Sequence, residues 1–259
     1  HGTPTFKKPP IILGHEISGT VAECGSSVSK FQEGDPVLLP AVLTCGSCEF
    51  CRRGRENICA NMIMFGNHIN GGFAEYVATP AKDILPLPKD MPLADASIIA
   101  DAVSTPYHAV ANRGQVKPGD TVAVFGCGGV GINVVQMSAL FGADVIAVDL
   151  DNQKLAMAKE MGAKHTINPK EVEKVPKRIR EIVAGVGADI AFEVIGNPVT
   201  IRTAYESVRR GGRVVVVGYS DKEVSISPAR LMFFEIEMIG SLGCRPVDYL
   251  TIIRLAHSG

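Results

Sequence analysis

The sequence contains no tryptophan, few aromatic residues and almost no net charge. Aromatic residues make up 6% of the 259 residues, and the formal net charge is −1. Proteins that bind nucleic acids usually present an excess of lysine and arginine, so the balanced charge argues against a nucleic-acid partner. With 46% hydrophobic and 20% charged residues, the composition is that of an ordinary globular protein.

Long hydrophobic runs are also missing. The longest apolar runs hold about six residues, whereas a helix needs about 20 to span a bilayer, and the first residues do not resemble a signal peptide. We therefore expect no membrane span and a cytoplasmic protein. The chain starts at His1 rather than methionine and stops at Gly259 just after a helical pattern, so we expect a piece of a longer protein that lacks both ends.

Cysteine, in contrast, is clustered. Four of the seven cysteines lie in the stretch LTCGSCEFCRRGRENICAN at 43–61, with the spacing C-x2-C-x2-C-x7-C. Because we expect no secretory signal, this density indicates a metal site rather than disulfides. Four thiolates complete the tetrahedral shell of a zinc ion and leave no position for a substrate, so such a zinc is structural. The predicted ligands are Cys45, Cys48, Cys51 and Cys59.

An iron–sulfur cluster is the alternative occupant of this stretch. The bacterial ferredoxin pattern also begins C-x2-C-x2-C, but it continues x3-C-P. Here the last gap is seven residues and Ala60 follows Cys59, so the spacing favours zinc.

The pattern of secondary structure changes along the chain. Short strands separated by glycines are predicted between residues 11 and 79, including one over 73–79, and two helices over 93–100 and 104–113. From Gly119 onward, strands alternate with helices, which is typical of a doubly wound parallel sheet in an α/β fold. The six predicted strands are 121–126, 144–149, 165–168, 189–196, 213–219 and 237–243.

A glycine-rich loop follows the first of these strands. Gly126, Gly128 and Gly131 have the spacing G-x-G-x-x-G and precede a helix. The first glycine permits a tight turn, the second lets the backbone approach a pyrophosphate, and the third lets helix and strand pack closely. The start of the helix then faces the anion. The loop therefore predicts a dinucleotide site, to which Gly129 and Val130 also belong.

The next strand ends at Asp149, eighteen residues beyond the last glycine of the loop. A carboxylate there accepts hydrogen bonds from ribose hydroxyls and repels a 2′-phosphate, which favours NAD over NADP; the alternative is that Asp149 only caps a turn. Lys154 is placed to reach the ribose. Ile195, Val217 and Gly218 end two later strands, at the edge where the nicotinamide half is expected.

Taken together, these motifs resemble the zinc-dependent medium-chain alcohol dehydrogenases. GHEISGTV, KFQEGDPV, the cysteine stretch, GGFAEYV, GCGGVG and VIAVD follow one another in that family's order and spacing. The resemblance implies a GroES-like, partly open β-barrel catalytic domain, incomplete here, joined to a Rossmann domain. We expect the first domain at 1–103, with the structural zinc in the lobe 43–61, and the second at 104–259.

The resemblance also implies a second, catalytic zinc. The histidine of GHE, His15, is a ligand in that family, and the adjacent Glu16 lies in or near the metal's shell. Asp101 occupies a position where better-known alcohol dehydrogenases have cysteine; a carboxylate oxygen is an acceptable zinc ligand, although Asp101 could instead cap the helix that follows. Thr105 matches a residue that packs against the nicotinamide. The family's first catalytic ligand and its proton-relay hydroxyl correspond to positions before His1.

The implied activity is hydride transfer between an alcohol and NAD to give a ketone or an aldehyde. The stretch ADAVSTPYHAV at 100–110 is similar to that of bacterial 6-hydroxycyclohex-1-ene-1-carbonyl-CoA dehydrogenases, so a cyclic or CoA-linked alcohol is one option, and a polyol or sugar is another. The alternatives are a zinc-free reductase of the same superfamily and a nucleotide-binding regulatory module with a structural zinc only. Members of the family form homodimers or homotetramers.

Overall fold

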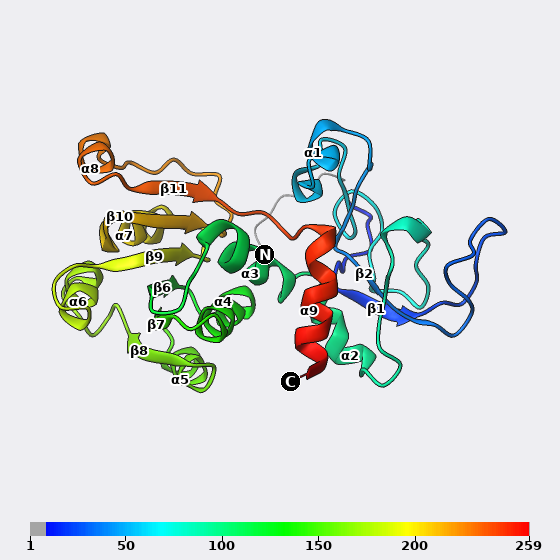
Figure 1. Ribbon diagram of the computed structural model, residues 1–259, viewed down its shortest axis with the longest axis horizontal. Helices are drawn as coiled ribbons and strands as arrows, with labels where there is room; N and C mark the ends of the chain where they lie inside the picture. The colour runs from blue at the N-terminus through cyan, green and yellow to red at the C-terminus, as the bar shows by residue number, and fades with distance from the viewer. Residues whose placement is uncertain (1–8, 259) are drawn as a thin grey trace. The chain divides into compact units, whose positions relative to one another are not determined.

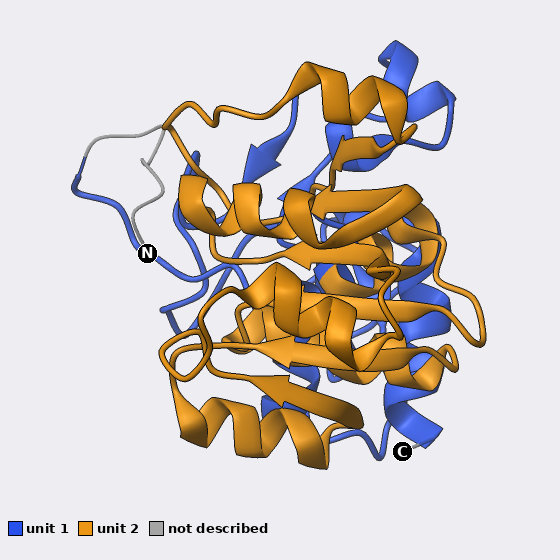
Figure 2. Ribbon diagram, turned by 90° about the vertical axis from the view of Figure 1, so that its left-hand side faces the viewer, with its two compact units in different colours: residues 1–105, 243–259 blue, residues 106–242 orange. Residues whose placement is uncertain are grey.

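A computed structural model describes residues 9–258. The chain forms two compact units, one of residues 1–105 with 243–259 and one of residues 106–242 (Figure 2). The domain boundary expected between residues 103 and 104 stays a prediction. Within the described residues, no helix is both long and apolar enough to cross a membrane.

The first unit is built on short antiparallel strands. β1 (Ile17–Thr20), β2 (Pro36–Leu39) and β5 (Leu85–Pro86) form one sheet, and β3 (Val42–Leu43) pairs with β4 (Ile63–Met64). Alternating apolar positions of these strands face a small core of Phe31, Val37, Leu39, Leu43 and Phe65.

The strand predicted over 73–79 is wrong. Gly71, Gly72 and Phe73 instead donate backbone hydrogen bonds to Ile12, Gly14 and Leu13 over 2.8–3.0 Å. A Cβ atom on Gly71 would collide with the carbonyl group of Leu13 and that of Gly14. The two segments therefore approach more closely than regular strands do. The absence of side chains at Gly71 and Gly72 permits this close approach.

Short helices complete the first unit. α2 (Leu93–Ala96) and a 3-10 turn (Ser97–Ala100) occupy the first predicted helix. The second predicted helix is α3 (Ser104–Tyr107), in which the first unit passes into the second, followed by a π-helical stretch (His108–Gly114) that belongs to the second unit. The remaining helical elements of the first unit are α1 (Glu49–Arg52), α9 (Pro246–Ser258) and 3-10 turns at Glu56–Ile58 and Ala81–Asp83. α9 buries Tyr249, whose hydroxyl donates to the carbonyl of Ala100 over 2.7 Å.

The second unit contains the predicted parallel sheet, which is confirmed. Its strands lie in the order β11-β10-β9-β6-β7-β8 (Figure 1). The order reverses at β6, because the chain adds β7 and β8 on one side and β9, β10 and β11 on the other. The strands are β6 (Thr121–Phe125), β7 (Asp144–Val148), β8 (Ala163–Ile167), β9 (Ala188–Glu193), β10 (Val208–Val216) and β11 (Glu237–Gly240).

Helices connect these strands, and three of them, α5, α7 and α8, begin at a residue whose side chain caps the helix. The Asp151 side chain accepts from the N–H of Gln153 at the start of α5, and the Asn197 side chain accepts from the N–H of Val199 at the start of α7, as N-cap residues do. The helices are α4 (Gly129–Leu140), α5 (Asn152–Glu160), α6 (Val175–Ile182), α7 (Pro198–Ser207) and α8 (Pro228–Phe233).

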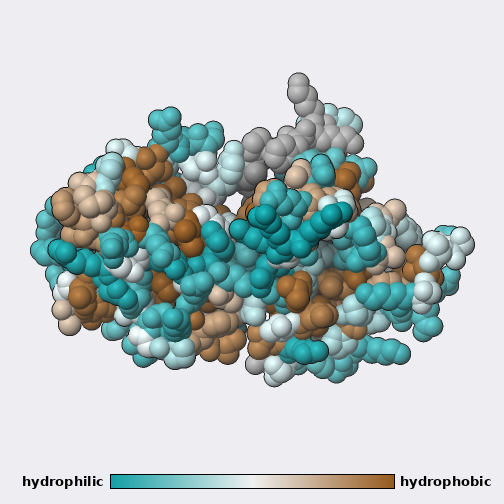
Figure 3. Space-filling view, turned by 45° about the horizontal axis from the view of Figure 1, so that its top comes forward, coloured by the Kyte–Doolittle hydropathy of each residue, from teal (hydrophilic) through white to brown (hydrophobic). Residues whose placement is uncertain are grey.

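The buried core of this unit is almost entirely apolar, with the central strands fully enclosed. Val122, Val124 and Ala191 have no exposed surface, as expected for strands covered on both faces. On the face drawn in Figure 3, hydrophilic and hydrophobic side chains are interspersed.

Candidate functional site

The four clustered cysteines come together in one lobe of the first unit. Their sulfur atoms all lie within 4.8 Å of one another. The distance between Sγ atoms is 3.5 Å for Cys48 and Cys51 and for Cys45 and Cys59, and 3.9 Å for Cys45 and Cys51. Thiolates bound to one tetrahedral zinc at about 2.3 Å stand about 3.8 Å apart. The sulfur spacing therefore fits a zinc ion.

The cysteines of this cluster differ in how readily they ionise. Backbone N–H groups of Ser47 and Cys48 lower the pKa of the Cys45 thiol to about 5, and the N–H of Cys48 lies 3.3 Å from the Cys45 sulfur. Burial and the neighbouring thiols raise the pKa of Cys51 to about 12. Hydrogen bonds from the backbone of Cys51 and Ala60 lower the pKa of Cys48 as well. A divalent metal ion bound by the four sulfurs would favour the thiolate form of all of them.

His15 and Asp101 meet in the same unit, although 86 residues separate them in the sequence. The His15 Nε2 atom lies 3.0 Å from the Asp101 Oδ2 atom. The hydroxyl of Thr105 donates to the other oxygen, Oδ1, of Asp101. Asp101 follows the 3-10 turn Ser97–Ala100, whereas His15 precedes β1. The tertiary fold alone brings the two side chains together.

Each member of this pair favours the charged form of the other. The hydrogen bond to Asp101 raises the pKa of His15. Burial opposes ionisation of Asp101, but the hydrogen bonds from His15 and Thr105 lower its pKa overall. An anionic oxygen and an imidazole nitrogen held this close are suitable ligands for zinc.

Glu16 points to a different partner. Its Oε1 atom accepts a hydrogen bond from the N–H of Ala102 over 2.8 Å. This contact gave no signal in the sequence, and the capping role considered for Asp101 stays an alternative. Among residues 9–258, the only group of three or more possible metal ligands is the cysteine cluster. His15 and Asp101 supply two donors, so a zinc ion there needs a ligand from elsewhere, and its ligation by His15, Glu16 and Asp101 stays a prediction.

The glycine loop of the second unit has the geometry its sequence predicts. Gly126 has a φ of +95°, a left-handed conformation that favours glycine. A Cβ atom on Gly131 would collide with the carbonyl oxygen of Gly126, whereas Gly128 and Gly129 face open space. Helix α4 starts at Gly129, with Val130 half-buried in its first turn. The backbone is therefore free for an anion to approach at the start of α4.

Asp149 lies directly beside this loop. Its Oδ2 atom accepts from the N–H of Cys127 over 2.8 Å, and its Oδ1 atom accepts from the N–H of Asp151 over 3.0 Å. These bonds fix the carboxylate and leave further acceptor positions on both oxygens. Lys154 is exposed on α5. Burial, with Asp149 nearby, raises the pKa of Cys127 to about 12, so this thiol stays neutral.

The loops after β9 and β10 contain the other predicted cofactor residues. Ile195 is half exposed, and Val217 and Gly218 both donate backbone hydrogen bonds to the carbonyl of Glu193. Glu193 itself, fully buried at the end of β9, was not predicted as a site residue. Its one signal in the sequence is an acidic residue directly after the apolar run 190–192 at the end of β9.

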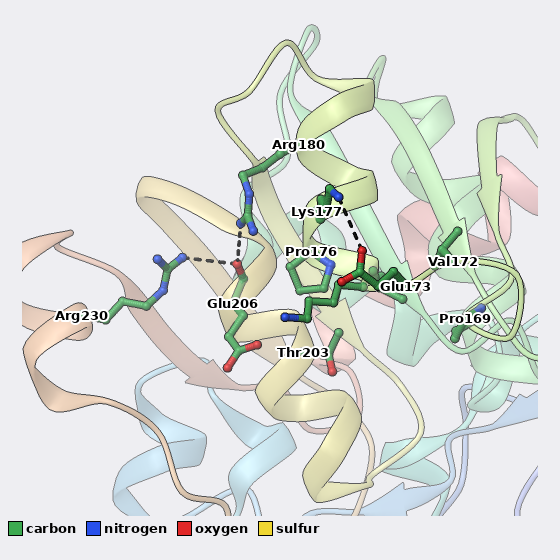
Figure 4. A pocket seen from close by; sticks show the side chains of 11 residues that line it. Pro169, Val172, Glu173, Pro176, Lys177, Arg180, Thr203, Glu206 and Arg230 are labelled. Atoms are coloured by element: carbon green, nitrogen blue, oxygen red, sulfur yellow. Dashed lines mark hydrogen bonds and ion pairs between the residues drawn. The ribbon is translucent and has the colours of Figure 1, made fainter.

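A separate hollow of about 540 Å³ lies elsewhere in the second unit, between α6, α7 and α8 (Figure 4). Arg180 and Arg230 both point to the backbone oxygen of Glu206 there, over 3.2 and 3.4 Å. The two arginines satisfy carbonyl groups at the end of α7 and interact favourably with its dipole. No residue predicted for the cofactor lines this hollow.

Two family models match the chain. Residues 1–89 match the alcohol dehydrogenase GroES-like domain, and residues 129–258 match the zinc-binding dehydrogenase model. These matches include the cysteine lobe in the first case and the helix after the glycine loop in the second.

Similar whole proteins and structures agree with these matches. A sorbitol dehydrogenase of Bacillus subtilis (strain 168) is 37% identical over 234 residues, which cover 89% of this chain and 65% of that protein. An alcohol dehydrogenase of Geobacillus stearothermophilus is 34% identical over 261 residues, covering 100% and 76%. The crystal structure of an alcohol dehydrogenase from the archaeon Aeropyrum pernix superposes with a TM-score of 0.90 at 33% identity, covering 97% of this chain and 74% of that one. The chain thus spans about two thirds to three quarters of these relatives.

Proposed function

Because the chain belongs to the zinc-dependent medium-chain alcohol dehydrogenase family, we propose that it transfers a hydride between an alcohol and NAD, giving a ketone or an aldehyde. The observation that carries the proposal is the contact between His15 and Asp101, two possible metal ligands brought to 3.0 Å from distant parts of the sequence. Without a metal ion, the same histidine and carboxylate form an ion pair, so the zinc content of the protein distinguishes a metal site from an ion pair.

In this proposal, the Nε2 atom of His15 and an oxygen of Asp101 hold the catalytic zinc. Bound zinc acts as a Lewis acid that lowers the pKa of an alcohol, as it lowers that of water. Thr105 occupies the Oδ1 atom of Asp101 and so directs Oδ2 toward His15. Glu16 accepts a hydrogen bond from the N–H of Ala102. Because it directly follows His15 in the sequence, it can take the place of another ligand of the metal.

The second unit holds the cofactor. NAD accepts the hydride at its nicotinamide ring when bound. The glycine loop offers open backbone at the start of α4 for the pyrophosphate, and Asp149 accepts hydrogen bonds from the ribose hydroxyls. A 2′-phosphate would meet the fixed carboxylate of Asp149, which is why we propose NAD rather than NADP. Ile195, Val217 and Gly218 line the nicotinamide side, and Lys154 approaches the ribose.

The cysteine lobe holds the structural zinc. Its four sulfur atoms leave no coordination position for a substrate, so it stabilises the lobe and takes no part in the reaction.

A polyol or sugar is the second candidate substrate class. The 37% identity to a sorbitol dehydrogenase favours it, as does the carboxylate at position 101 in place of the cysteine of better-known alcohol dehydrogenases. A cyclic or CoA-linked alcohol rests only on the resemblance of the stretch 100–110.

We also propose a cytoplasmic homodimer or homotetramer. None of the seven cysteines forms a disulfide, which suits a reducing compartment. β11 lies at one edge of the parallel sheet and offers unpaired backbone groups to a second copy.

The decisive experiment counts zinc per chain by elemental analysis of the full-length protein and its Asp101→Ala variant. We expect two zinc ions to fall to one, with alcohol oxidation lost at the same time. Asp90→Ala is the matched control, because Asp90 is an exposed carboxylate of the same unit that pairs with His257; it should keep both zinc ions. One zinc in the wild-type protein would leave only the cysteine site and would contradict the proposal.

A further inference from the structure

Glu193 is a buried acidic residue with no cationic partner among the described residues. None of its surface is exposed, and no lysine, arginine or histidine of residues 9–258 forms a salt bridge with it. A buried carboxyl group is costly unless hydrogen bonds replace the lost water. Its neighbours must therefore supply donors.

Those donors come from the loop that follows β9 and from α7. The Oε1 atom of Glu193 accepts from the N–H of Ile195 over 3.1 Å, from the N–H of Gly196 over 3.0 Å and from the hydroxyl of Thr200 over 2.7 Å. The Oε2 atom accepts from the N–H of Gly196 over 3.1 Å. The side chain thus fixes the loop 194–197 to the first turn of α7, where the helix dipole also favours a carboxylate.

The backbone of the same residue holds a second loop. The carbonyl oxygen of Glu193 accepts from the N–H groups of Val217 and Gly218 over 2.8 and 3.0 Å. A Cβ atom on Gly218 would collide with the N–H of Gly196, so the loops after β9 and β10 touch through their backbones. One residue therefore fastens both loops.

The position of Glu193 in the sheet explains why this matters. β9 pairs directly with β6, with Glu193 opposite Phe125, the residue before the glycine loop. The strand order reverses between β9 and β7 around β6, and in open α/β sheets ligands bind outside the carboxyl ends of the strands at such a switch point. Ile195 also lies against Gly126, since a Cβ atom added to Gly126 would collide with the Ile195 side chain.

We propose that Glu193 is a positioning residue for the nicotinamide half of the cofactor. It acts by holding Ile195, Val217 and Gly218 in place rather than by contacting NAD. The inference rests on the proposed function, which assigns the nicotinamide to these two loops. Both carboxylate oxygens of Glu193 accept hydrogen bonds. A glutamine at this position would replace one of these oxygens with an NH₂ group, which cannot accept a hydrogen bond from the donor that faces it.

The test compares two ligands on the full-length protein and its Glu193→Gln variant. NADH spans both halves of the site, whereas ADP-ribose lacks the nicotinamide. We expect NADH to bind about tenfold more weakly to the variant, the size typical of a lost bond to a charged group, while the affinity for ADP-ribose changes by less than about twofold. Equal losses for both ligands, or no loss for NADH, would overturn the proposal.

Two further variants keep the comparison interpretable. Glu206→Gln removes an acidic group of α7 in the same unit that pairs with Arg202, and it should leave both affinities unchanged. Thr200→Val removes a single donor to Glu193, so it should weaken NADH binding in the same direction but less, even where Glu193→Gln folds poorly. A Thr200→Val protein that binds both ligands like the wild type would contradict the positioning role.

Amide hydrogen exchange on the ligand-free protein separates this inference from the proposed function. The amides of Ile195, Gly196, Val217 and Gly218 should exchange faster in Glu193→Gln than in the wild type, and those of β7 should not change. Unchanged exchange at the two loops would overturn the positioning role. Failure of the wild-type protein to bind NADH would instead overturn the proposed function. Faster exchange in Glu193→Gln would still show that Glu193 holds the loops after β9 and β10 in place.

Discussion

The cysteine lobe and the His15–Asp101 pair are two possible metal sites of the same unit, and they differ in what holds them together. The lobe brings four cysteine sulfurs to within 4.8 Å of one another, and these sulfurs repel one another when they are ionised. The pair joins a base and an acid at 3.0 Å, and each stabilises the charge of the other. The lobe therefore depends on a cation, whereas the pair is satisfied without one.

This difference predicts unequal costs when each site is damaged. A structural zinc contributes about 10 kcal/mol in small peptides because the unfolded chain has no preformed site. An ion pair near the surface contributes at most about 1 kcal/mol. Three measurements follow, from the largest expected effect to the smallest.

The largest effect is expected from Cys59→Ser in the lobe. Cys59 is buried, and its sulfur also accepts hydrogen bonds from the N–H groups of Cys45 and Asn61. We expect loss of one zinc per chain and a fall of about 3 kcal/mol or more in the free energy of unfolding, measured by elemental analysis and urea denaturation. Cys24→Ser is the control, because Cys24 is half-buried in the same unit but lies outside the lobe. A Cys59→Ser protein that keeps its zinc would show that Cys59 is not a ligand, and one that loses the zinc but keeps its stability would show that the lobe does not depend on the metal.

The same contrast explains what the sequence could reveal. All four lobe ligands lie within fifteen residues, so their spacing alone indicates the site. The glycine loop and the parallel strands are equally local patterns, and the structure confirms the sheet, as the family comparisons confirm the family. The contact between His15 and Asp101 spans 86 residues and was expected only through the resemblance.

Roles that depend on packing were missed for the same reason. Glu193 ends β9, and the donors to its side chain, Ile195, Gly196 and Thr200, follow within seven residues without forming a recognisable motif. The N–H groups of Val217 and Gly218, which donate to its carbonyl, come from the distant loop after β10. The bond from Ala102 to Glu16 likewise crosses 86 residues. A strand was predicted over 73–79 because apolar residues alternate there, but the close approach of Gly71 and Gly72 to residues 12–14 prevents regular pairing.

A smaller effect is expected from the pH dependence of the His15–Asp101 pair. The pKa of His15 is raised from its usual 6.5, so its contribution to stability is present below pH 6.5 and is lost as the pH rises through the raised value. The pKa of Asp101 is lowered from 3.8, so its contribution is present above that pH and is lost as the pH falls. In protein that retains only the lobe zinc, the pair should therefore stabilise the fold from about pH 4 up to the raised pKa of His15.

The matching experiment compares the wild type with His15→Gln in urea at two pH values. The side chains of His15 and Asp101 are 40% and 28% exposed, so solvent screening limits the difference to about 1 kcal/mol at pH 5.5. At pH 8.5 the charge of His15 is reduced and glutamine donates a comparable hydrogen bond, so the difference should be smaller. A difference that grows with pH would mean that the pair is not an ion pair, and the contrast with the lobe would fail.

The smallest effect is expected from Glu16→Gln, which asks whether Glu16 belongs to the metal site or to the fold. Its Oε1 atom accepts a hydrogen bond from the N–H of Ala102 over 2.8 Å, and a glutamine oxygen can accept the same bond. If Glu16 serves only that N–H, the free energy of unfolding should change by less than about 0.5 kcal/mol, and the zinc count should stay the same. Loss of one zinc would instead make Glu16 a ligand, giving the His15–Asp101 site a third donor and bringing it closer in kind to the cysteine lobe.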